Sequence, residues 1–280
     1  YNSENAYATT YGEHRDFLEF GAEEYRELQS YAKELSITFF ATAFDTSSAD
    51  FLGDLNMPAY KIASGDIKST PLLKHVAKFG KPMFVSTGGA TMEDVQRAYD
   101  TVMPINSQLC IMQCTASYPC SFETLNLSVI SAFRDAFPDI VIGLSGHDNG
   151  YTMGLVGYML GARAIEKHFT INRALKGTDQ PFSLEASGMR RLVRDLQRIP
   201  VALGDGVKRI YDDERAPIQK MGKSLVAARE LPAGHTLTSS DIALRSPAGG
   251  TPPYEFDHYI GRKTGKSLAT DDTIDETSVT

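Results

Sequence analysis

Cysteine is scarce in this chain, whose 280 residues contain only Cys110, Cys114 and Cys120. An odd and low number favours a reducing compartment over a disulfide scaffold, so we expect a cytoplasmic protein. No second pair accompanies Cys114 and Cys120, which argues against a structural zinc site. We expect small buried side chains; for Cys114, which ends a strand-like run, the alternative is a reactive thiol.

Long hydrophobic runs and clusters of one charge are also missing. No apolar run approaches the roughly 20 residues that cross a bilayer, and the first residues lack the basic and apolar regions of a signal peptide. The formal net charge of -7 favours solubility and argues against nucleic acid as the main partner. We therefore expect neither a membrane nor a nucleic acid as partner.

Apolar, β-rich runs recur along the first part of the chain, separated by about one helix and two short loops. They are nearly continuous in apolar residues, as buried parallel strands are when helices cover them. The runs are Ile37–Ala43, Ala59–Ala63, Pro82–Ser86, Leu109–Cys114, Ile140–Ser145 and Ala164–His168. The pattern predicts an α/β fold with a parallel sheet.

Helix signals occupy the stretches between these runs. Thr91 is a suitable N-cap before Val95–Met103, and Gly161 is a suitable end for Tyr151–Leu160. Further helices are predicted at Ala22–Leu35, Leu127–Phe137 and Glu185–Leu203. Six βα units are too few for a closed parallel barrel, which takes eight. We expect either an open sheet or, since the chain enters in a helix, a barrel whose first two βα units are absent from this chain.

The pattern changes after residue 206. Residues 207–222 are charged and lack clear apolar periodicity, so we interpret them as a linker. Residues 223–280 contain short β-like pieces separated by frequent turns, which predicts a small β-rich second domain. The first domain is then expected to span residues 1–206.

Two short segments each end a predicted strand with a histidine. They are Val141–His147, with His147, and Ala164–Thr170, with His168, and one helix-length stretch lies between them. A strand, a helix and a second strand make a parallel βαβ unit, so the two carboxyl ends are neighbours on one rim. Two imidazoles there can hold one divalent metal where ligands of α/β folds usually bind.

Several motifs together resemble the sialic acid synthases, from about Tyr11 to Ile274. They are Lys61-Ile62-Ala63-Ser64-Gly65-Asp66, Ser86-Thr87-Gly88, Gln113-Cys114-Thr115-Ala116-Ser117-Tyr118-Pro119, Gly143-Leu144-Ser145-Gly146-His147 and Glu166-Lys167-His168-Phe169-Thr170. The C-terminal part resembles that family's antifreeze-like (SAF) domain, opening at Gly222-Lys223-Ser224. The segment Thr10–Arg15 is similar to the animal-type branch, whose members use a 6-phosphorylated sugar.

The resemblance implies a TIM (β/α)8-type barrel that condenses phosphoenolpyruvate with an N-acetylmannosamine-type sugar. It implies Mn²⁺ or Mg²⁺ held by His147 and His168, and a homodimer in which each SAF domain covers the partner's barrel mouth. Asp66 and Asp179 are expected to act as general bases or to bind sugar hydroxyls, and Glu166 and Lys167 to form ion pairs at the rim. The implied substrate-binding residues are Thr42, Lys61, Ser64, Ser86, Thr87, Gln113, Thr115, Tyr118, Ser145 and Arg245.

Some family features are missing, which keeps alternatives open. The glutamate and lysine of the family's first two strands do not occur, and Ser246 stands where bacterial members carry an arginine before Pro-Gly, with Arg245 beside it. One alternative is a bacterial-type synthase acting on the unphosphorylated sugar or a related nonulosonate precursor. The other is a non-catalytic binding or dimerisation module.

Overall fold

A computed structural model describes residues 4–280 of the chain. It divides into two compact units, the first ending at Leu203 and the second spanning Gly204–Thr280. Within the described residues, no helix is both long and apolar enough to cross a membrane. Residues 207–222, interpreted above as a linker, contain a helix, α9 (Asp212–Met221), which opens with three acidic side chains in its first turn.

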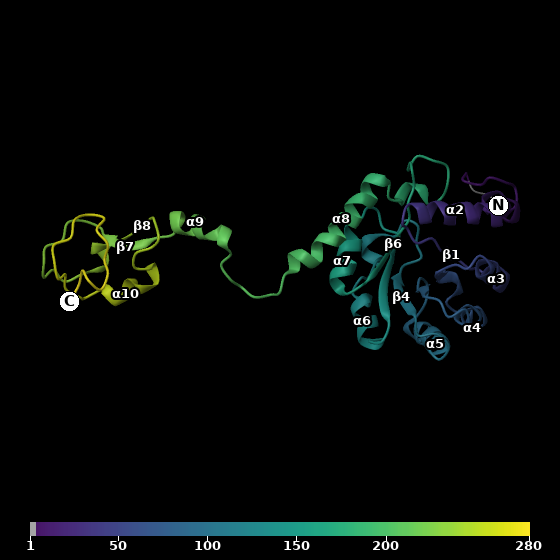
Figure 1. Cartoon of the computed structure of the whole chain (residues 1–280), viewed down its shortest axis with the longest axis horizontal. Coiled ribbons are helices and arrows are strands. Elements are labelled where there is room, and N and C mark those ends of the chain that lie inside the picture. The colour runs from purple at the N-terminus through teal and green to yellow at the C-terminus, as the bar shows by residue number, and fades with distance from the viewer. Residues whose placement is uncertain (1–3) are drawn as a thin grey trace. The chain divides into compact units, whose positions relative to one another are not determined.

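The first unit is built on one parallel sheet whose six strands lie in chain order (Figure 1). They are β1 (Ala41–Thr42), β2 (Tyr60–Ile62), β3 (Met83–Ser86), β4 (Leu109–Cys114), β5 (Val141–Gly146) and β6 (Ala164–Lys167). The registers place Lys61 beside Phe84, Cys114 beside Ser145, and Gly146 beside Lys167. All carboxyl ends therefore reach the same rim, as predicted.

Strand β1 is shorter than the expected run Ile37–Ala43. Within residues 4–280 it pairs only with β2, through Ala41 and Thr42. An edge strand with one neighbour has fewer backbone hydrogen bonds to extend it. The apolar residues before it still pack: Phe39 lies against the core, while Ile37 is exposed.

Helices cover the convex side of this sheet (Figure 1). They are α2 (Ala22–Glu34), α3 (Thr46–Asp54), α4 (Thr70–Ala77), α5 (Met92–Val102), α6 (Val129–Ala136), α7 (Thr152–Leu160) and α8 (Ala186–Leu203), preceded by α1 (Tyr11–Leu18). The N-cap predicted at Thr91 is confirmed, since its hydroxyl accepts from the Asp94 amide. Gly161 ends α7 in a left-handed conformation with φ 112°, also as predicted.

The core fills the layer between sheet and helices. Ile62, Val85, Ile111, Ile142 and Leu144 point from alternate strand positions into it and are almost fully buried. Burying one such side chain contributes roughly 1.5–3 kcal/mol. The intervening positions of the strands point to the opposite, concave face, and the side chains there are free to form a site.

The second unit is a small β-rich fold. Strands β7 (Ser224–Ala227) and β8 (Ile242–Arg245) pair antiparallel, and isolated bridges join Leu231 to Leu268 and Val226 to Thr273. A short helix, α10 (Phe256–Tyr259), contributes the buried Tyr259 to its core. The buried Asp241 carboxylate accepts from Arg229, His235 and Thr238, which ties the loops together.

Candidate functional site

A buried lysine lies on the concave face at the carboxyl end of β2. Lys61 is 8% exposed, and its Nζ donates to Ser86 Oγ at 2.7 Å and to the Ile62 carbonyl at 3.2 Å. The Glu166 carboxylate on β6 lies 3.5 Å from the same ammonium and accepts from Ser145 Oγ at 2.8 Å. Lysine, carboxylate and two serines from four strands thus share one polar cluster. A buried ammonium among hydroxyl groups is suited to bind an anion.

The loop after β2 adds a further hydroxyl to this cluster. Ser64 begins a 3-10 turn, Ser64–Asp66, and its Oγ accepts from the Gly88 amide at 3.0 Å and lies 3.4 Å from Cys114 Sγ. A Cβ on Gly88 would lie 2.8 Å from Ser64 Oγ and 2.7 Å from Ala116 Cβ. Gly88 therefore keeps the floor of the site open where three loops converge.

The two predicted histidines lie side by side after β5 and β6. Their ring centroids are 5.2 Å apart with an interplanar angle of 76°. His147 Nδ1 lies 2.9 Å from the Thr115 carbonyl, to which it donates, so Nε2 carries the free lone pair. His168 Nδ1 lies 3.4 Å from Asp179 Oδ2. Each ring is therefore oriented through one nitrogen and keeps the other for a ligand, the arrangement of metal-binding histidines.

These donors fit a divalent metal with an open coordination shell. Among residues 4–280, no group of three or more histidine, cysteine, aspartate and glutamate side chains could enclose a metal. A metal held by the two imidazoles alone would keep positions for water or substrate oxygens, as catalytic sites do. Tyr118, 4.1 Å from His147 and 5.8 Å from His168 between ring centroids, and Phe182 form an aromatic wall beside the pair.

The two predicted carboxylates have opposite electrostatic environments. Burial, and then the nearby charge of Asp45, raises the pKa of Asp66 above its ordinary value. The hydrogen bond with His168 lowers the pKa of Asp179, which keeps that carboxylate ionised. The raised pKa suits Asp66 to exchanging a proton, and the lowered pKa suits Asp179 to accepting hydroxyl hydrogen bonds.

The three cysteines are buried, as expected, yet two of them differ in acidity. Burial raises the pKa of Cys110 to about 12, so this thiol stays protonated. Burial also opposes ionisation of Cys114, but hydrogen bonds with His147 and Ser64 outweigh it and lower its pKa. The Cys114 Sγ lies 4.0 Å from His147 Nδ1, at the centre of the site.

Other predicted substrate contacts lie at the margin of this cluster. Thr87, directly after β3, and Gln113, on β4, face the helices and donate to the Met112 and Leu125 carbonyls. Their roles in binding substrate remain predictions that this placement does not favour. Thr115 donates through Oγ1 to the Thr124 carbonyl at 2.8 Å. Thr42, beside Lys61 in the sheet, lines a cavity of about 670 Å³ with Tyr11 and Arg15.

Arg245 belongs to the second unit. It lies at the end of β8, where its Nε is 3.4 Å from Asp271 Oδ1, and it lines a cavity of about 350 Å³. A role in binding sugar remains a prediction for this residue.

Sequence reasoning identified the ion pairs of Glu166 and Lys167 but not their partners. Glu166 pairs with Lys61, whereas Lys167 pairs with Asp148 through two fully buried side chains. Asp148 follows His147 directly, and this position was the one sign in the sequence that Asp148 belongs near the site. Its pairing with Lys167 could not be predicted without the register of β5 against β6.

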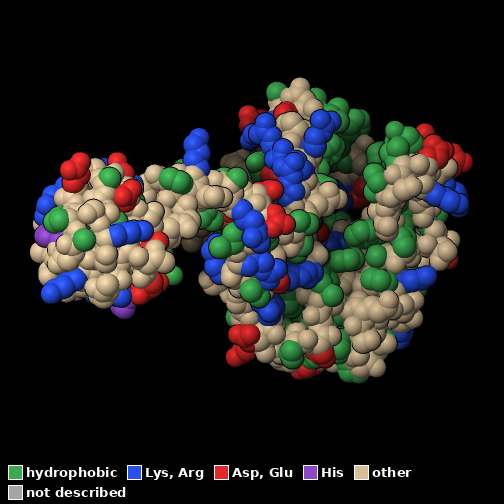
Figure 2. Space-filling view, turned by 60° about the vertical axis from the view of Figure 1, so that its left-hand side comes forward, with side chains coloured by type: hydrophobic (Ala, Val, Ile, Leu, Met, Phe, Trp, Pro, Cys, Tyr) green, Lys and Arg blue, Asp and Glu red, His purple; other side chains and the backbone are tan. Residues whose placement is uncertain are grey.

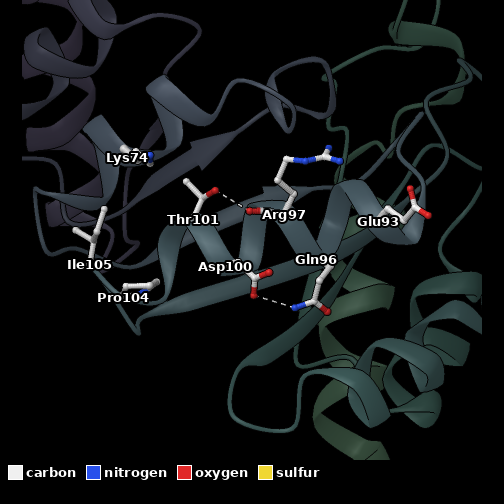
Figure 3. A pocket seen from close by; sticks show the side chains of 8 residues that line it. All are labelled: Lys74, Glu93, Gln96, Arg97, Asp100, Thr101, Pro104 and Ile105. Carbon is white, nitrogen blue, oxygen red and sulfur yellow. Dashed lines mark hydrogen bonds between the residues drawn. The ribbon is translucent and has the colours of Figure 1, made fainter.

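A different cavity, of about 620 Å³, lies on the outer helices and contains none of the predicted site residues. Figure 3 shows its side chains, which come mainly from α5, with Lys74 from α4.

Helix α8 carries the exposed arginines 190, 191, 194 and 198, and Figure 2 shows a group of basic side chains on the first unit. Asp195 pairs with Arg194 and Arg198. These features are separate from the concave face where the predicted chemistry gathers.

Comparison with known proteins decides the family. Residues 1–208 match the NeuB family, and residues 222–279 match the SAF domain. The chain belongs to the NeuB family. The predicted resemblance to sialic acid synthases and the barrel-type fold with a SAF domain are thereby confirmed.

Named relatives of this NeuB chain include animal and bacterial enzymes. It is 40% identical over 280 residues to the N-acetylneuraminate-9-phosphate synthase of Mus musculus, covering 100% of this chain and 78% of that protein. It is 32% identical to the N,N'-diacetyllegionaminic acid synthase of Campylobacter jejuni, covering 92% of this chain and 78% of that protein. A solved N-acetylneuraminic acid synthetase from Leptospira borgpetersenii superposes with a TM-score of 0.66 at 32% identity, over 71% of this chain and 70% of that one.

Proposed function

We propose that this chain condenses phosphoenolpyruvate with N-acetylmannosamine 6-phosphate and water to give N-acetylneuraminate 9-phosphate and phosphate. One observation carries the proposal: the Lys61 anion site and the His147/His168 pair occupy the concave face of one sheet, at one rim. The identity of 40% to an animal synthase of the 9-phosphate, over the whole chain, supports this substrate.

Phosphoenolpyruvate brings a phosphate and a carboxylate to a site that offers one buried ammonium and several hydroxyl donors. Lys61 binds one of these anionic groups, and Ser86, whose hydroxyl accepts from Lys61 Nζ, donates its own proton to it. The hydroxyls of Ser64 and Ser145, which donate to Cys114 and Glu166 in the structure, turn to the anion when it binds. Glu166 partly neutralises Lys61 before the substrate arrives, and it is the group that must move when the anion pairs with the ammonium.

His147 and His168 would hold a divalent cation, Mn²⁺ or Mg²⁺, in this proposal. When bound, that cation supplies Lewis-acid polarisation of the open-chain sugar aldehyde. The protein's own contribution is orientation: the Thr115 carbonyl and the Asp179 carboxylate fix the two rings, and the wall of Tyr118 and Phe182 shields them from water.

The reaction then forms a carbon–carbon bond and, from water, a carbon–oxygen bond, and it breaks the carbon–oxygen bond to phosphate, while the former aldehyde oxygen gains a proton. Carbon 3 of phosphoenolpyruvate attacks the sugar carbonyl, water adds at carbon 2, and the tetrahedral intermediate expels phosphate. Asp66, whose pKa burial raises, takes the proton of the attacking water, and the ionised Asp179 accepts hydrogen bonds from sugar hydroxyls.

Two rival functions make different predictions. A bacterial-type synthase would act on the free sugar, and the lower identity to the Campylobacter enzyme supports this reading less. A non-catalytic module would bind ligands without forming product. The intact cluster of Lys61, Ser86, His147 and His168 supports an enzyme instead.

Phosphate release separates these functions. The chain is incubated with phosphoenolpyruvate and Mn²⁺, and with either N-acetylmannosamine 6-phosphate or the free sugar. We expect release that depends on the phosphorylated sugar. Faster phosphate release with the free sugar would support the bacterial-type function. If neither sugar gives phosphate release, the result would support the non-catalytic function.

In the same proposal the protein works in the cytoplasm as a homodimer. Each SAF domain then covers the partner's barrel mouth and brings Arg245 to the sugar. Size-exclusion chromatography with light scattering checks the dimer, for which we expect about twice the chain mass of 30.7 kDa.

A further inference from the structure

A buried ion pair lies immediately beside the two histidines. Lys167 Nζ is 2.9 Å from Asp148 Oδ1 and donates at 2.6 Å to the Asp148 backbone carbonyl. Both side chains are 1% exposed. Asp148 follows His147 in the chain, and Lys167 precedes His168, so this pair joins the two histidine-bearing segments directly.

The register of β5 against β6 and the glycine at residue 146 make this contact possible. Gly146 of β5 lies beside Lys167 of β6. A Cβ at Gly146 would lie 3.0 Å from Asp148 Oδ1 and 3.3 Å from Lys167 Cδ. The absence of a side chain at residue 146 therefore makes room for the ion pair between the two strands.

The backbone around His147 is held at several points. Its carbonyl accepts from the Cys120 amide at 3.0 Å, its ring contacts the Thr115 carbonyl, and the next carbonyl accepts from Lys167. The first two contacts come from the loop after β4. Lys167 supplies the link to β6, the strand that carries His168.

A contribution to the stability of the fold does not by itself explain why this ion pair is present. Removing two charges from water costs more than an ion pair commonly returns, and well-packed apolar residues often serve a core equally well. Within residues 4–280, the buried Asp148 Oδ2 has no hydrogen-bond partner, which increases the cost further. A costly contact at this position points to a role in the geometry of the neighbouring histidines.

We propose that Asp148 and Lys167 are positioning residues that fix the spacing of His147 and His168 for a shared divalent cation. The inference rests on the proposed function, since that function assigns the cation to the two rings. It assigns no contact with substrate to Asp148 or Lys167, whose side chains lie on the helix-facing side of the sheet, opposite Glu166.

Binding of Mn²⁺ to the full chain, measured by isothermal titration calorimetry without substrates, tests the proposal. The informative variant is K167M/D148L, which replaces the charged pair with apolar side chains and leaves no uncompensated charge. Asp148→Asn retains the shape and an acceptor for Lys167 in case the double variant fails to fold. Lys68→Met is the control, because it breaks a lysine–aspartate pair away from the histidines, between the turn before α4 and Asp94 on α5.

We expect the folded double variant to bind Mn²⁺ about 10- to 100-fold more weakly than the wild type, which is the typical effect of mutating residues that hold metal ligands in place. The Mn²⁺ affinity of Asp148→Asn should lie between those of the wild type and the double variant. The affinity of Lys68→Met should match that of the wild type within about twofold. The thermal melt of each variant reports folding separately from binding.

A folded double variant that binds Mn²⁺ as tightly as the wild type overturns the positioning role and leaves the proposed function intact. A wild type that binds no Mn²⁺, yet turns over normally, overturns the metal assignment and the positioning role together. Absence of turnover by the wild type with Mn²⁺ bound counts against the proposed function alone.

Discussion

The ring of His147 lies 5.2 Å from the ring of His168, and each ring is oriented by a different oxygen, the Thr115 carbonyl and the Asp179 carboxylate. Neighbouring parallel strands end on the same rim, so β5 and β6 bring the two imidazoles together. Lys61 and Glu166 occupy the same concave face. This one rim therefore combines a site for an anion with ligands for a cation.

Removing one imidazole should remove metal-dependent turnover. We expect His168→Ala to lower phosphate release in the presence of Mn²⁺ by at least about 100-fold, because a single remaining ring is a weak ligand. His75→Ala, which alters a histidine paired with Asp50 on the outer helices, is the matched control and should retain activity. Equal losses in both variants would indicate damage to the fold instead.

Lys61 should act mainly on phosphoenolpyruvate. Lys61→Met removes a charge-assisted contact, so we expect kcat/KM for phosphoenolpyruvate to fall about 10- to 100-fold. Steady-state kinetics with varied phosphoenolpyruvate at saturating sugar measure the change. Unchanged kcat/KM would mean that the ammonium serves only Glu166 and Ser86.

Gly88 should tolerate no side chain. A Cβ there would lie 2.7 Å from Ala116 Cβ, 2.8 Å from Ser64 Oγ and 3.0 Å from the Ala116 amide nitrogen. Gly88→Ala must therefore displace Ser64 or the loop after β4, and we expect a drop in kcat/KM of about tenfold or more with the fold retained. Gly65→Ala, which meets no atom within 4 Å, provides the control. A fully active Gly88→Ala variant would show that this loop adapts freely.

Asp94 should make stability depend on pH at the acidic end. Hydrogen bonds from the Thr91 amide, Lys68 and Arg97 hold its pKa well below the ordinary value in the folded chain. A lowered folded pKa gives stabilisation that is complete above the unfolded pKa of about 3.9 and is lost as pH falls through the folded pKa.

Urea unfolding of the wild type and Asp94→Asn at pH 7, 5 and 3 measures this linkage. We expect the difference in unfolding free energy to be the same at pH 7 and 5 and smaller at pH 3. A difference that stays constant to pH 3 would contradict the assignment.

Much of the fold follows from the periodic order of the chain. The run Leu109–Cys114 is strand β4 to the residue, because a central buried strand reads as continuous apolar sequence. The run Ile37–Ala43 predicted a longer strand than β1, because apolar residues can pack beside the edge of a sheet without pairing with its strands. Helix α9 was missed because its polar, surface-exposed sequence lacks the apolar periodicity used to find helices.

The site was predictable in part. The histidine pair could be placed from the βαβ order alone, since topology fixes which strand ends meet. The Asp148–Lys167 contact could not, since it depends on strand register and on the space left by Gly146. Thr87 and Gln113 point toward the helices because side chains alternate along a strand, and a shift of one position reverses the face.

The central claim is that one rim holds a cation at His147 and His168 and an anion at Lys61. A crystal structure of the chain soaked with Mn²⁺ and phosphoenolpyruvate, with an anomalous map at the manganese edge, tests it most directly. We predict a manganese peak bonded to ring nitrogens of both histidines and phosphoenolpyruvate oxygens hydrogen-bonded to Lys61 Nζ. Manganese bound away from both rings, or phosphoenolpyruvate bound away from Lys61, would contradict the account.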